Sequence, residues 1–271
     1  MPGPLAGVRV LDLTRALAGP YGAMILGDLG AEIIKIEGPG GDMTRSTPPH
    51  FHLGLSMYFI SVNRNKKSVG IDLKNQKGKE VFYQLVKHGD VVFENFRAGV
   101  AKQMKLDYQS LKAINPRIIT CSLSGYGTKG PLAYQPAYDL PIQALSGGMS
   151  MTGEPGRPPV RAGLPIADLC GGMFAAHGIM AALYSREKTG EGQPVDVSLL
   201  GGQISLLSYA AGYYFKSGEP SGPVGSGHQT TVPYRAFKTA DGWITVAAGQ
   251  DQFWPKLCRA MGMEEMINDE K

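Results

Sequence analysis

The apolar positions of this chain alternate between short runs and longer stretches of helical spacing. Residues 7–14 (GVRVLDLT) and 31–37 (AEIIKIE) are largely β-branched runs bounded by turn residues, which predicts two strands. Between them, residues 21–30 (YGAMILGDLG) have the spacing of a helix, with Pro20 expected at its first position and Gly30 just past its end. The order strand–helix–strand predicts a βαβ unit.

The same pattern recurs further along the chain. Residues 90–95 (DVVFEN) are almost continuously apolar, as is typical of strands that helices cover on both faces. We therefore predict an α/β fold with an open parallel sheet in a Rossmann-like large domain. The other strands are expected at 68–74, 116–125 and 193–200, and the other helices at 75–88, 107–115, 138–147 and 168–188, with one more from about 200 to Phe215.

The composition changes after Phe215. Residues 216–229 are rich in Gly, Pro and Ser, which indicates either a linker or an ordered functional loop. Beyond them, turn residues near 240–242 predict a hairpin, and residues 251–263 predict a helix. We predict three segments: a large domain over 1–215, a glycine-rich connection over 216–229, and the start of a smaller α+β domain over 230–271.

Charge and composition narrow the class of protein. Hydrophobic residues make up 43% of the 271 residues and charged residues 18%, a balance that excludes a disordered chain. The net charge is only +4, and no block of Lys or Arg reaches the length of a nucleic-acid-binding arm. This slight excess suits an anionic small molecule better than a polyanion, so we expect no nucleic-acid partner.

The cysteines and histidines carry no metal-ligand pattern. Cys121, Cys170 and Cys258 have no CxxC spacing, so the sequence supports neither a disulfide framework nor a zinc cage. A reducing compartment is the simpler interpretation, and no uncharged apolar run reaches the roughly 18 residues that span a bilayer. The five histidines are scattered. We expect a cytoplasmic protein with no membrane partner and no metal.

The loops after the strands hold the candidate residues, because ligands of open α/β sheets bind beyond the carboxyl ends of the strands. The loop 15–20 leads into a helix whose free N–H groups suit a phosphate, but it lacks the GxGxxG pattern of dinucleotide sites. Glu37 stands where a ribose-binding acid would fall; the alternative is a solvated strand end. A nicotinamide or flavin site is therefore disfavoured.

Two polar clusters at other strand ends each allow two interpretations. Residues 63–67 (NRNKK), before a strand, and Lys74, at its end, either hold phosphates or form a solvated face. Asn95 either contacts a ligand or caps the next helix. Phe96 has the chemistry to stack on a purine, and Arg97 to pair with a phosphate.

Asp168 opens the predicted helix ADLCGGMFAAHG and either caps it or aims a carboxylate at a substrate. The small residues Gly171, Gly172, Ala175 and Ala176 on this helix let another backbone or a ligand come close. From these residues alone, capping is the favoured interpretation.

Taken together and in order, the motifs resemble the class III coenzyme A transferase family, of the carnitine-dehydratase/bile-acid-inducible type. The resemblance extends over essentially the whole chain. It rests on GVRVLDLT, LAGP, LGDLGAEIIKIE, GDMTR, NRNKKS, FENFR, GYGTKGP, ADLCGG and GSGHQTTVPYRAFKT. It implies a Rossmann-like large domain, a small domain and a homodimer of two interlocked subunits. It also implies that a coenzyme A thioester is a substrate and that no cofactor is permanently bound.

The resemblance implies roles for individual residues. Asp168 matches the aspartate nucleophile of the family, and Tyr138 matches an active-site position. The segment with Gly225 and Gly227 resembles a loop that covers the aspartate, where backbone N–H groups help to stabilise an oxyanion. The predicted coenzyme A contacts are Leu17, Ala18, Lys74, Asn95, Phe96, Arg97 and Met104.

Two reactions divide the family. Racemases carry a histidine where this chain has Tyr138, and loss of the imidazole removes a group suited to acid/base work on the α-carbon. The favoured prediction is transfer of coenzyme A from an acyl-CoA, succinyl-CoA by resemblance, to a free dicarboxylic acid. It would proceed through an aspartyl anhydride and an aspartyl-CoA thioester at Asp168.

Two alternatives stay open. The first is an α-methylacyl-CoA racemase or a related acyl-CoA isomerase. The second is a noncatalytic CoA-binding fragment, because family members continue beyond the position of Lys271. Leu17 stands where oxalate/formate-specific members carry a glutamine, which disfavours formyl transfer.

Overall fold

The computed structural model describes residues 1–269, which form two compact units. The first, here called the large unit, comprises Met1–Ser146 and Gly163–Leu207. The second, the small unit, comprises Gly147–Ala162 and the chain from Ser208 onward. The expected glycine-rich connection and the expected small domain fall within the small unit. Residues 147–162 and 208–215, which were expected in the large domain, also belong to the small unit.

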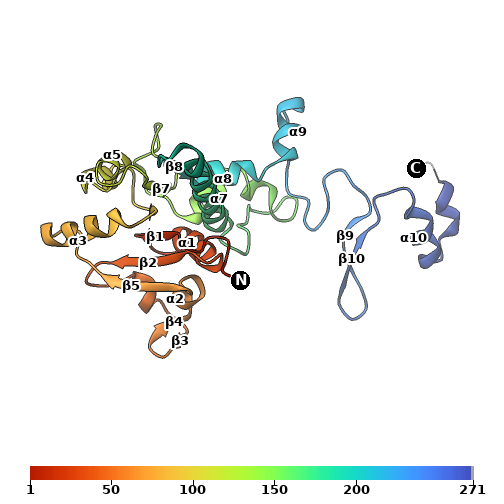
Figure 1. The fold of residues 1–271 in the computed structure, drawn as a ribbon. Helices are drawn as coiled ribbons and strands as arrows, with labels where there is room; N and C mark the ends of the chain where they lie inside the picture. The colour runs from red at the N-terminus through yellow and green to blue at the C-terminus, as the bar shows by residue number, and fades with distance from the viewer. Residues whose placement is uncertain (270–271) are drawn as a thin grey trace. The chain divides into compact units, whose positions relative to one another are not determined.

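The large unit is built on one open sheet of six strands, and every neighbouring pair is parallel. The strands lie in the order β5-β2-β1-β6-β7-β8 (Figure 1). They span β1 (Arg9–Asp12), β2 (Glu32–Glu37), β5 (Lys66–Gly70), β6 (Val91–Glu94), β7 (Ile119–Ser124) and β8 (Pro194–Ser198). This confirms the predicted α/β fold with a parallel sheet. The strand order reverses between β1 and β6, and such a switch point opens a crevice at the carboxyl ends of the strands.

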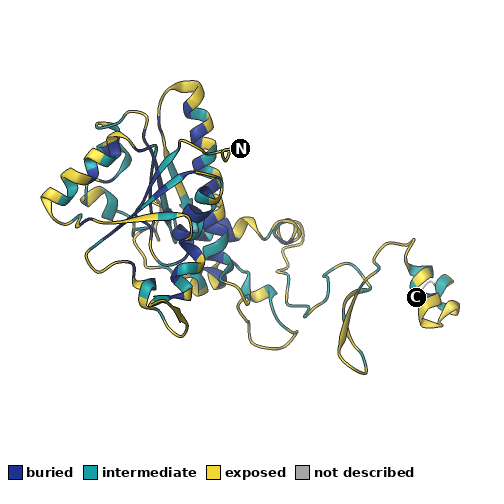
Figure 2. Ribbon diagram, turned by 60° about the horizontal axis from the view of Figure 1, so that its bottom comes forward, coloured by how far each residue is buried: buried dark blue, intermediate teal, exposed yellow. Residues whose placement is uncertain are grey.

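Helices cover both faces of this sheet. Successive side chains of each strand point to opposite sides, so the apolar strands present two apolar faces that must be buried. Val10 and Phe93 pack into one core cluster, while Leu11 and Val92 pack into the other. Figure 2 shows the buried residues gathered in the strands and along the inner sides of the helices. The first cluster lies under α1 (Ala18–Asp28), α6 (Asp139–Leu145), α7 (Ile166–Thr189) and α8 (Leu199–Ser205), and the second under α3 (Gln76–Lys87), α4 (Val100–Gln103) and α5 (Tyr108–Lys112).

A further segment of the large unit lies between β2 and β5. It contains the 3₁₀ helix η1 (Met43–Ser46), the short hairpin of β3 (Phe51–His52) and β4 (Leu55–Ser56), and α2 (Met57–Val62). The sequence pattern did not predict these short elements.

Helix α7 is long and apolar enough to cross a membrane by length and composition. Half of that apolar stretch is buried within the protein, where it packs against α1 and the sheet. This is the position of a core helix.

Small residues bring α7 and α1 close together. A Cβ atom added to Gly172 would lie 2.5 Å from the carbonyl oxygen of Ala18, and one added to Gly22 would lie 2.7 Å from the carbonyl oxygen of Gly172. The expectation that Gly172 admits a second backbone is therefore confirmed.

Three predicted boundaries are wrong. The strand expected at 68–74 is β5, which ends at Gly70, because Asp72 turns the chain: its Oδ1 accepts from the Lys74 N–H at 3.0 Å. Helix α1 begins at Ala18, so Pro20 is its third residue and not its first. The helix expected to reach Phe215 ends at Ser205, and a new helix begins after Ser208, which has a positive φ of 49°.

The small unit contains α9 (Tyr209–Ser217), the 3₁₀ helices η2 (Met149–Met151) and η3 (Glu264–Asn268), and α10 (Trp254–Met261). Its strands β9 (Tyr234–Lys238) and β10 (Trp243–Ala247) pair as an antiparallel hairpin. The predicted hairpin and the predicted C-terminal helix are thus confirmed.

Candidate active site

A cavity of about 250 Å³ lies at the switch point of the large unit, and we call it the Asp168 cavity. The loops that follow β1, β6 and β7 line it, together with the segment before α6 and the first turn of α7. It brings together seven residues that the sequence singled out, namely Leu17, Ala18, Asn95, Phe96, Arg97, Tyr138 and Asp168.

A larger cavity of about 540 Å³, the Lys74 cavity, shares Arg15 and Phe96 with the first. Lys74 and Met104, the two remaining predicted coenzyme A contacts, line it. The Arg15 guanidinium lies 5.9 Å from the centre of the Phe96 ring, within the range of a cation–π contact. All the predicted coenzyme A contacts therefore lie around two cavities that share one wall.

The loop between β1 and α1 is held in place by Asn95. The Asn95 side chain accepts from the Arg15 N–H and donates to the Arg15 carbonyl oxygen, both at 2.8 Å. The following residue, Ala16, has a positive φ of 62°, a conformation that a residue with a side chain adopts only when its surroundings impose it. The helix-cap alternative for Asn95 is wrong, because Gly99 is the N-cap residue of α4.

Asp168 is the third residue of α7, and the N-cap residue is Pro165. The capping interpretation is therefore wrong. The N–H groups of Ala167 and Asp168, in the first turn of α7, donate to Oδ1 of Asp139, at 2.9 and 3.3 Å. Asp139 thus satisfies the start of α7. Its other oxygen accepts from the Gln143 amide at 2.6 Å.

The Asp168 carboxyl has an unusual acidity. Burial, and then the negative charge of Asp139, raise its pKa to about 6. Tyr138, the residue before Asp139, is the N-cap residue of α6 and is 75% exposed. The site therefore places the half-buried Asp168 carboxyl near the exposed Tyr138 phenol, and Asp139 accepts the hydrogen bonds from the first N–H groups of α7.

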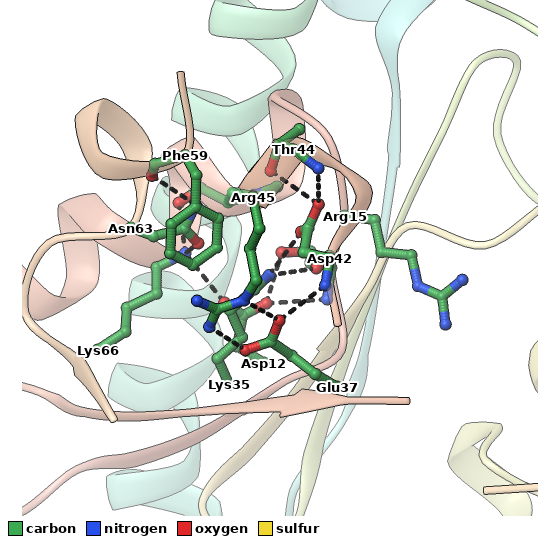
Figure 3. Close-up of polar contacts among 12 residues, drawn as sticks. Asp12, Arg15, Lys35, Glu37, Asp42, Thr44, Arg45, Phe59, Asn63 and Lys66 are labelled. Atoms are coloured by element: carbon green, nitrogen blue, oxygen red, sulfur yellow. Dashed lines mark hydrogen bonds and ion pairs between the residues drawn. The ribbon is translucent and has the colours of Figure 1, made fainter. Parts of the chain in front are cut away.

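Two buried ion pairs fix the loops next to this cavity (Figure 3). Lys66 Nζ lies 3.0 Å from Oδ2 of Asp12 and also donates to Asn63 Oδ1 at 3.0 Å. Lys35 Nζ lies 2.9 Å from Oδ2 of Asp42. Both lysine side chains are only 2% exposed. In Figure 3 the Arg15 side chain points away from this network.

Glu37 forms a third part of the network. It accepts from Arg45 at 2.6 Å and from Ser68 at 2.6 Å, and Arg45 lies over the Phe59 ring at 4.0 Å. Burial opposes ionisation, but the hydrogen bonds from Arg45, Ser68 and the Asp42 N–H outweigh it and lower the pKa of Glu37 to about 2. The solvated-strand-end alternative for Glu37 is wrong, because the residue is buried. A ribose would have to displace the protein donors that already occupy both carboxylate oxygens.

In the basic run 63–67, Arg64, Asn65 and Lys67 are exposed, as the solvated-face alternative expects, whereas Asn63 and the Lys66 side chain are buried. Besides the buried Lys66, Arg64 pairs with Asp28 at 2.5 Å and Lys67 with Glu32 at 2.7 Å. The run therefore ties β5 to its neighbours.

Gly225 and Gly227 lie in the small unit. Their N–H groups donate to the carbonyl oxygens of Gly153 and Val224, at 2.8 and 3.0 Å. A role as oxyanion donors would therefore require these bonds to open, and the role stays a prediction. Among residues 1–269, no three His, Cys, Asp or Glu side chains gather as metal ligands.

The sequence profile described as CoA-transferase family III matches residues 5–271. The chain belongs to this family.

Curated relatives in the family are similar over nearly the whole chain. Succinyl-CoA:glutarate CoA-transferase of Mus musculus is 44% identical over 98% of this chain and 61% of its own length. Acetyl-CoA:oxalate CoA-transferase of Acetobacter aceti is 42% identical over 98% of this chain and 69% of its own length. The chain thus spans about three fifths of the mouse relative.

Solved structures in the family share the fold. A CAIB/BAIF family protein from Brucella suis is 39% identical and superposes with a TM-score of 0.90, over 100% of this chain and 72% of that protein. Rv3272 from M. tuberculosis is 33% identical with a TM-score of 0.89, over 99% of this chain and 72% of that protein.

Asp139 and Glu94 are two acids next to the Asp168 cavity that the sequence did not single out as candidates. Asp139 directly follows the predicted Tyr138, so an acid one position from a candidate was the available signal. Glu94 is an acid inside the otherwise apolar run DVVFEN, and it is only 5% exposed. A charge in a predicted buried strand was the signal in that case.

Proposed function

We propose that the protein transfers coenzyme A from an acyl-CoA donor to a free carboxylic acid, with Asp168 as the nucleophile. The supporting observation is that Asp168 and the predicted coenzyme A contacts line adjoining cavities at the switch point of the sheet. Succinyl-CoA as donor and a dicarboxylate as acceptor fit the mouse relative's name. Arg15 and Arg97 offer cations at the cavity for these anions.

A carboxylate nucleophile suits this exchange, because every intermediate remains an activated acyl group. An Asp168 oxygen attacks the donor thioester carbonyl, the C–S bond breaks, and a mixed anhydride and the coenzyme A thiolate result. The thiolate attacks the aspartyl Cγ, the anhydride C–O bond breaks, and the donor leaves as a free carboxylate. The acceptor carboxylate then attacks the aspartyl-CoA thioester, and the same two steps run in reverse. No net proton is gained or lost.

The environment of Asp168 favours attack. With a pKa of about 6, the carboxyl is mostly ionised at pH 7 yet more basic than an ordinary aspartate. Because Asp139 takes the first N–H groups of α7, those groups do not withdraw charge from the Asp168 oxygens. The partial burial of Asp168 also limits the water that would hydrolyse an anhydride.

The test compares the full protein with Asp168→Ala, using succinyl-CoA and a panel of dicarboxylates. We expect transfer to fall at least roughly 10³-fold, as on loss of other enzyme nucleophiles. The dissociation constant of coenzyme A should stay nearly unchanged. Asp251→Ala, at an exposed position, is the matched control.

Trapping separates this mechanism from its alternatives. After donor treatment, hydroxylamine should leave an adduct on the peptide that contains Asp168. An active Asp168→Ala protein would overturn the mechanism. Exchange of the α-proton of the acyl-CoA without any transfer would instead support a racemase.

A further inference from the structure

Glu94, the last residue of β6, is a buried acid that the proposed mechanism does not use. It is 5% exposed. Its Oε2 accepts from the Phe96 N–H at 2.6 Å, and its Oε1 accepts from the Ser122 hydroxyl on β7 at 2.5 Å. The carboxyl therefore links the neighbouring strand to the backbone of the turn that follows its own strand.

That turn forms the wall between the cavities of the site. Phe96 lines both the Asp168 cavity and the Lys74 cavity, and Arg97 lines the first. The intervening Asn95 holds the Arg15 backbone from the same turn. Any change in the path of the chain from Glu94 to Arg97 therefore reaches both cavities at once.

Glu94 itself lines a third cavity of about 270 Å³, the Glu94 cavity. Phe96, Arg97 and Ser124 line both this cavity and the Asp168 cavity. The charged and titratable groups around it are Asp196 of β8, Lys102 of α4, Asp107 and Tyr108 at the start of α5, Arg97, Tyr134, and the buried Cys121 of β7. Asp196 is itself bound by the Thr128 hydroxyl at 2.5 Å. Within residues 1–269, no lysine or arginine forms an ion pair with Glu94.

We propose that Glu94 is a positioning residue for acyl-CoA: through its bond to the Phe96 N–H, it holds the Asn95–Arg97 turn in the shape that coenzyme A requires. The proposal rests on the proposed function, because it takes coenzyme A as the ligand of the adjoining cavities. Glu94 acts through the backbone and does not touch the reacting atoms.

The geometry also predicts a pH dependence. Burial raises the pKa of Glu94 to about 7; the bonds from Ser122 and the Phe96 N–H oppose this rise, and the charge of Asp196 adds to it. Both oxygens act as acceptors, which is the arrangement of the ionised form. Below about pH 7 the carboxyl gains a proton, its acceptor strength falls, and the turn is held less firmly.

The experiment measures the dissociation constant of free coenzyme A, and the KM and kcat of transfer, from pH 6 to pH 8.5. Glu94→Ala should weaken coenzyme A binding and raise the KM for acyl-CoA roughly tenfold, the scale of one lost hydrogen bond to a charged group, with a smaller change in kcat. Glu94→Gln keeps an acceptor for the Phe96 N–H. It should bind nearly as the parent does at pH 6.5 and fall behind it above pH 7.

The matched control is Glu80→Gln, on the exposed face of α3. The phosphate and thiol of coenzyme A also titrate, but they do so equally in every variant, so the ratio of dissociation constants isolates Glu94. If Glu94→Ala does not fold, Ser122→Ala serves as a second test. It removes a hydrogen bond that lowers the pKa of Glu94, so the pH below which coenzyme A binding weakens should move up.

Each outcome decides the proposal. A folded Glu94→Ala protein that binds coenzyme A as tightly as the parent overturns it, and so does a ratio for Glu94→Gln that stays flat across pH. A parent protein that binds coenzyme A without transferring it contradicts the proposed function alone. A parent that does not bind coenzyme A overturns both.

Discussion

The two units of this protein bury very different amounts of apolar surface. The large unit encloses two core clusters, with Phe82 and Phe93 fully buried. In the described part of the small unit, only Ala210 and Cys258 are buried, and Trp243 is 71% exposed. Both units have regular elements, but only the large one has a core.

This difference teaches where the stability of the chain resides. Removal of apolar area from water is the main favourable term in folding, whereas backbone hydrogen bonds contribute little net free energy. The β9–β10 hairpin satisfies its backbone without burying its side chains. We therefore expect the large unit to carry the free energy of unfolding of this chain.

The largest expected effect compares two phenylalanines. Phe82→Ala should lower the free energy of unfolding by about 3–5 kcal/mol, because it removes a fully buried ring. Phe237→Ala, at a position 39% exposed on β9, should cost less than about 1 kcal/mol. Urea unfolding of both variants checks this. Equal losses would show that the small unit has a core of its own.

A second comparison uses adjacent lysines of β5. Lys66→Met leaves Asp12 buried without its cation, which should cost about 3 kcal/mol, at the lower end of the usual range because Thr14 still donates to Asp12. Lys67→Met removes a partner of Glu32 that is 75% exposed, and should cost about 0–1 kcal/mol. Urea midpoints measure both. A mild loss for Lys66→Met would contradict the stabilising role assigned to this buried ion pair.

Acid should weaken the large unit through Glu37. Its pKa is lowered to about 2 in the folded chain, so its stabilising contribution is complete above pH 4.5 and is lost as the pH falls towards 2. Between pH 5 and pH 3 the loss should be on the order of 1 kcal/mol. Glu37→Gln should be less stable than the parent at pH 6 and should show a shallower decline. Parallel declines would contradict this assignment.

The smallest expected effect is a shift in a pH profile. Asp139→Asn retains an oxygen for the two N–H groups of α7 but removes the charge that helps to raise the pKa of Asp168. The acid limb of transfer, expected near pH 6, should move to lower pH by a fraction of a unit. Initial rates between pH 5 and pH 8 measure it. A shift to higher pH would contradict the electrostatic role of Asp139.

The sequence predicted the parts of this fold that depend on local pattern. The βαβ order, the buried runs and the glycine-bounded helices lead to the parallel sheet, whose switch point then brings Asp168 and the loop 15–20 together. Periodicity could not give the end of β5, because Asp72 turns the chain within an apolar run. It also could not assign single charges.

Long-range pairs explain most of what the sequence left open. Lys66 meets Asp12 across the sheet from 54 positions away, and Asp139 meets the start of α7 from 28 positions away. The sequence of a basic run is the same whether its side chains meet solvent or a buried acid. The sequence around an aspartate near a helix start is likewise the same whether that aspartate caps its own helix or another residue does. Only tertiary packing decides between those outcomes.

The glycine contact between α1 and α7 gives the site an unusual sensitivity. The first turns of both helices border the same cavity, and Gly172 leaves no room for a methyl group against Ala18. A side chain at position 172 would push Asp168, the proposed nucleophile, away from the loop 15–20, which is expected to hold the thioester, while the sheet beneath stayed intact. The absence of a Cβ atom at Gly172 therefore sets how close Asp168 lies to the loop 15–20.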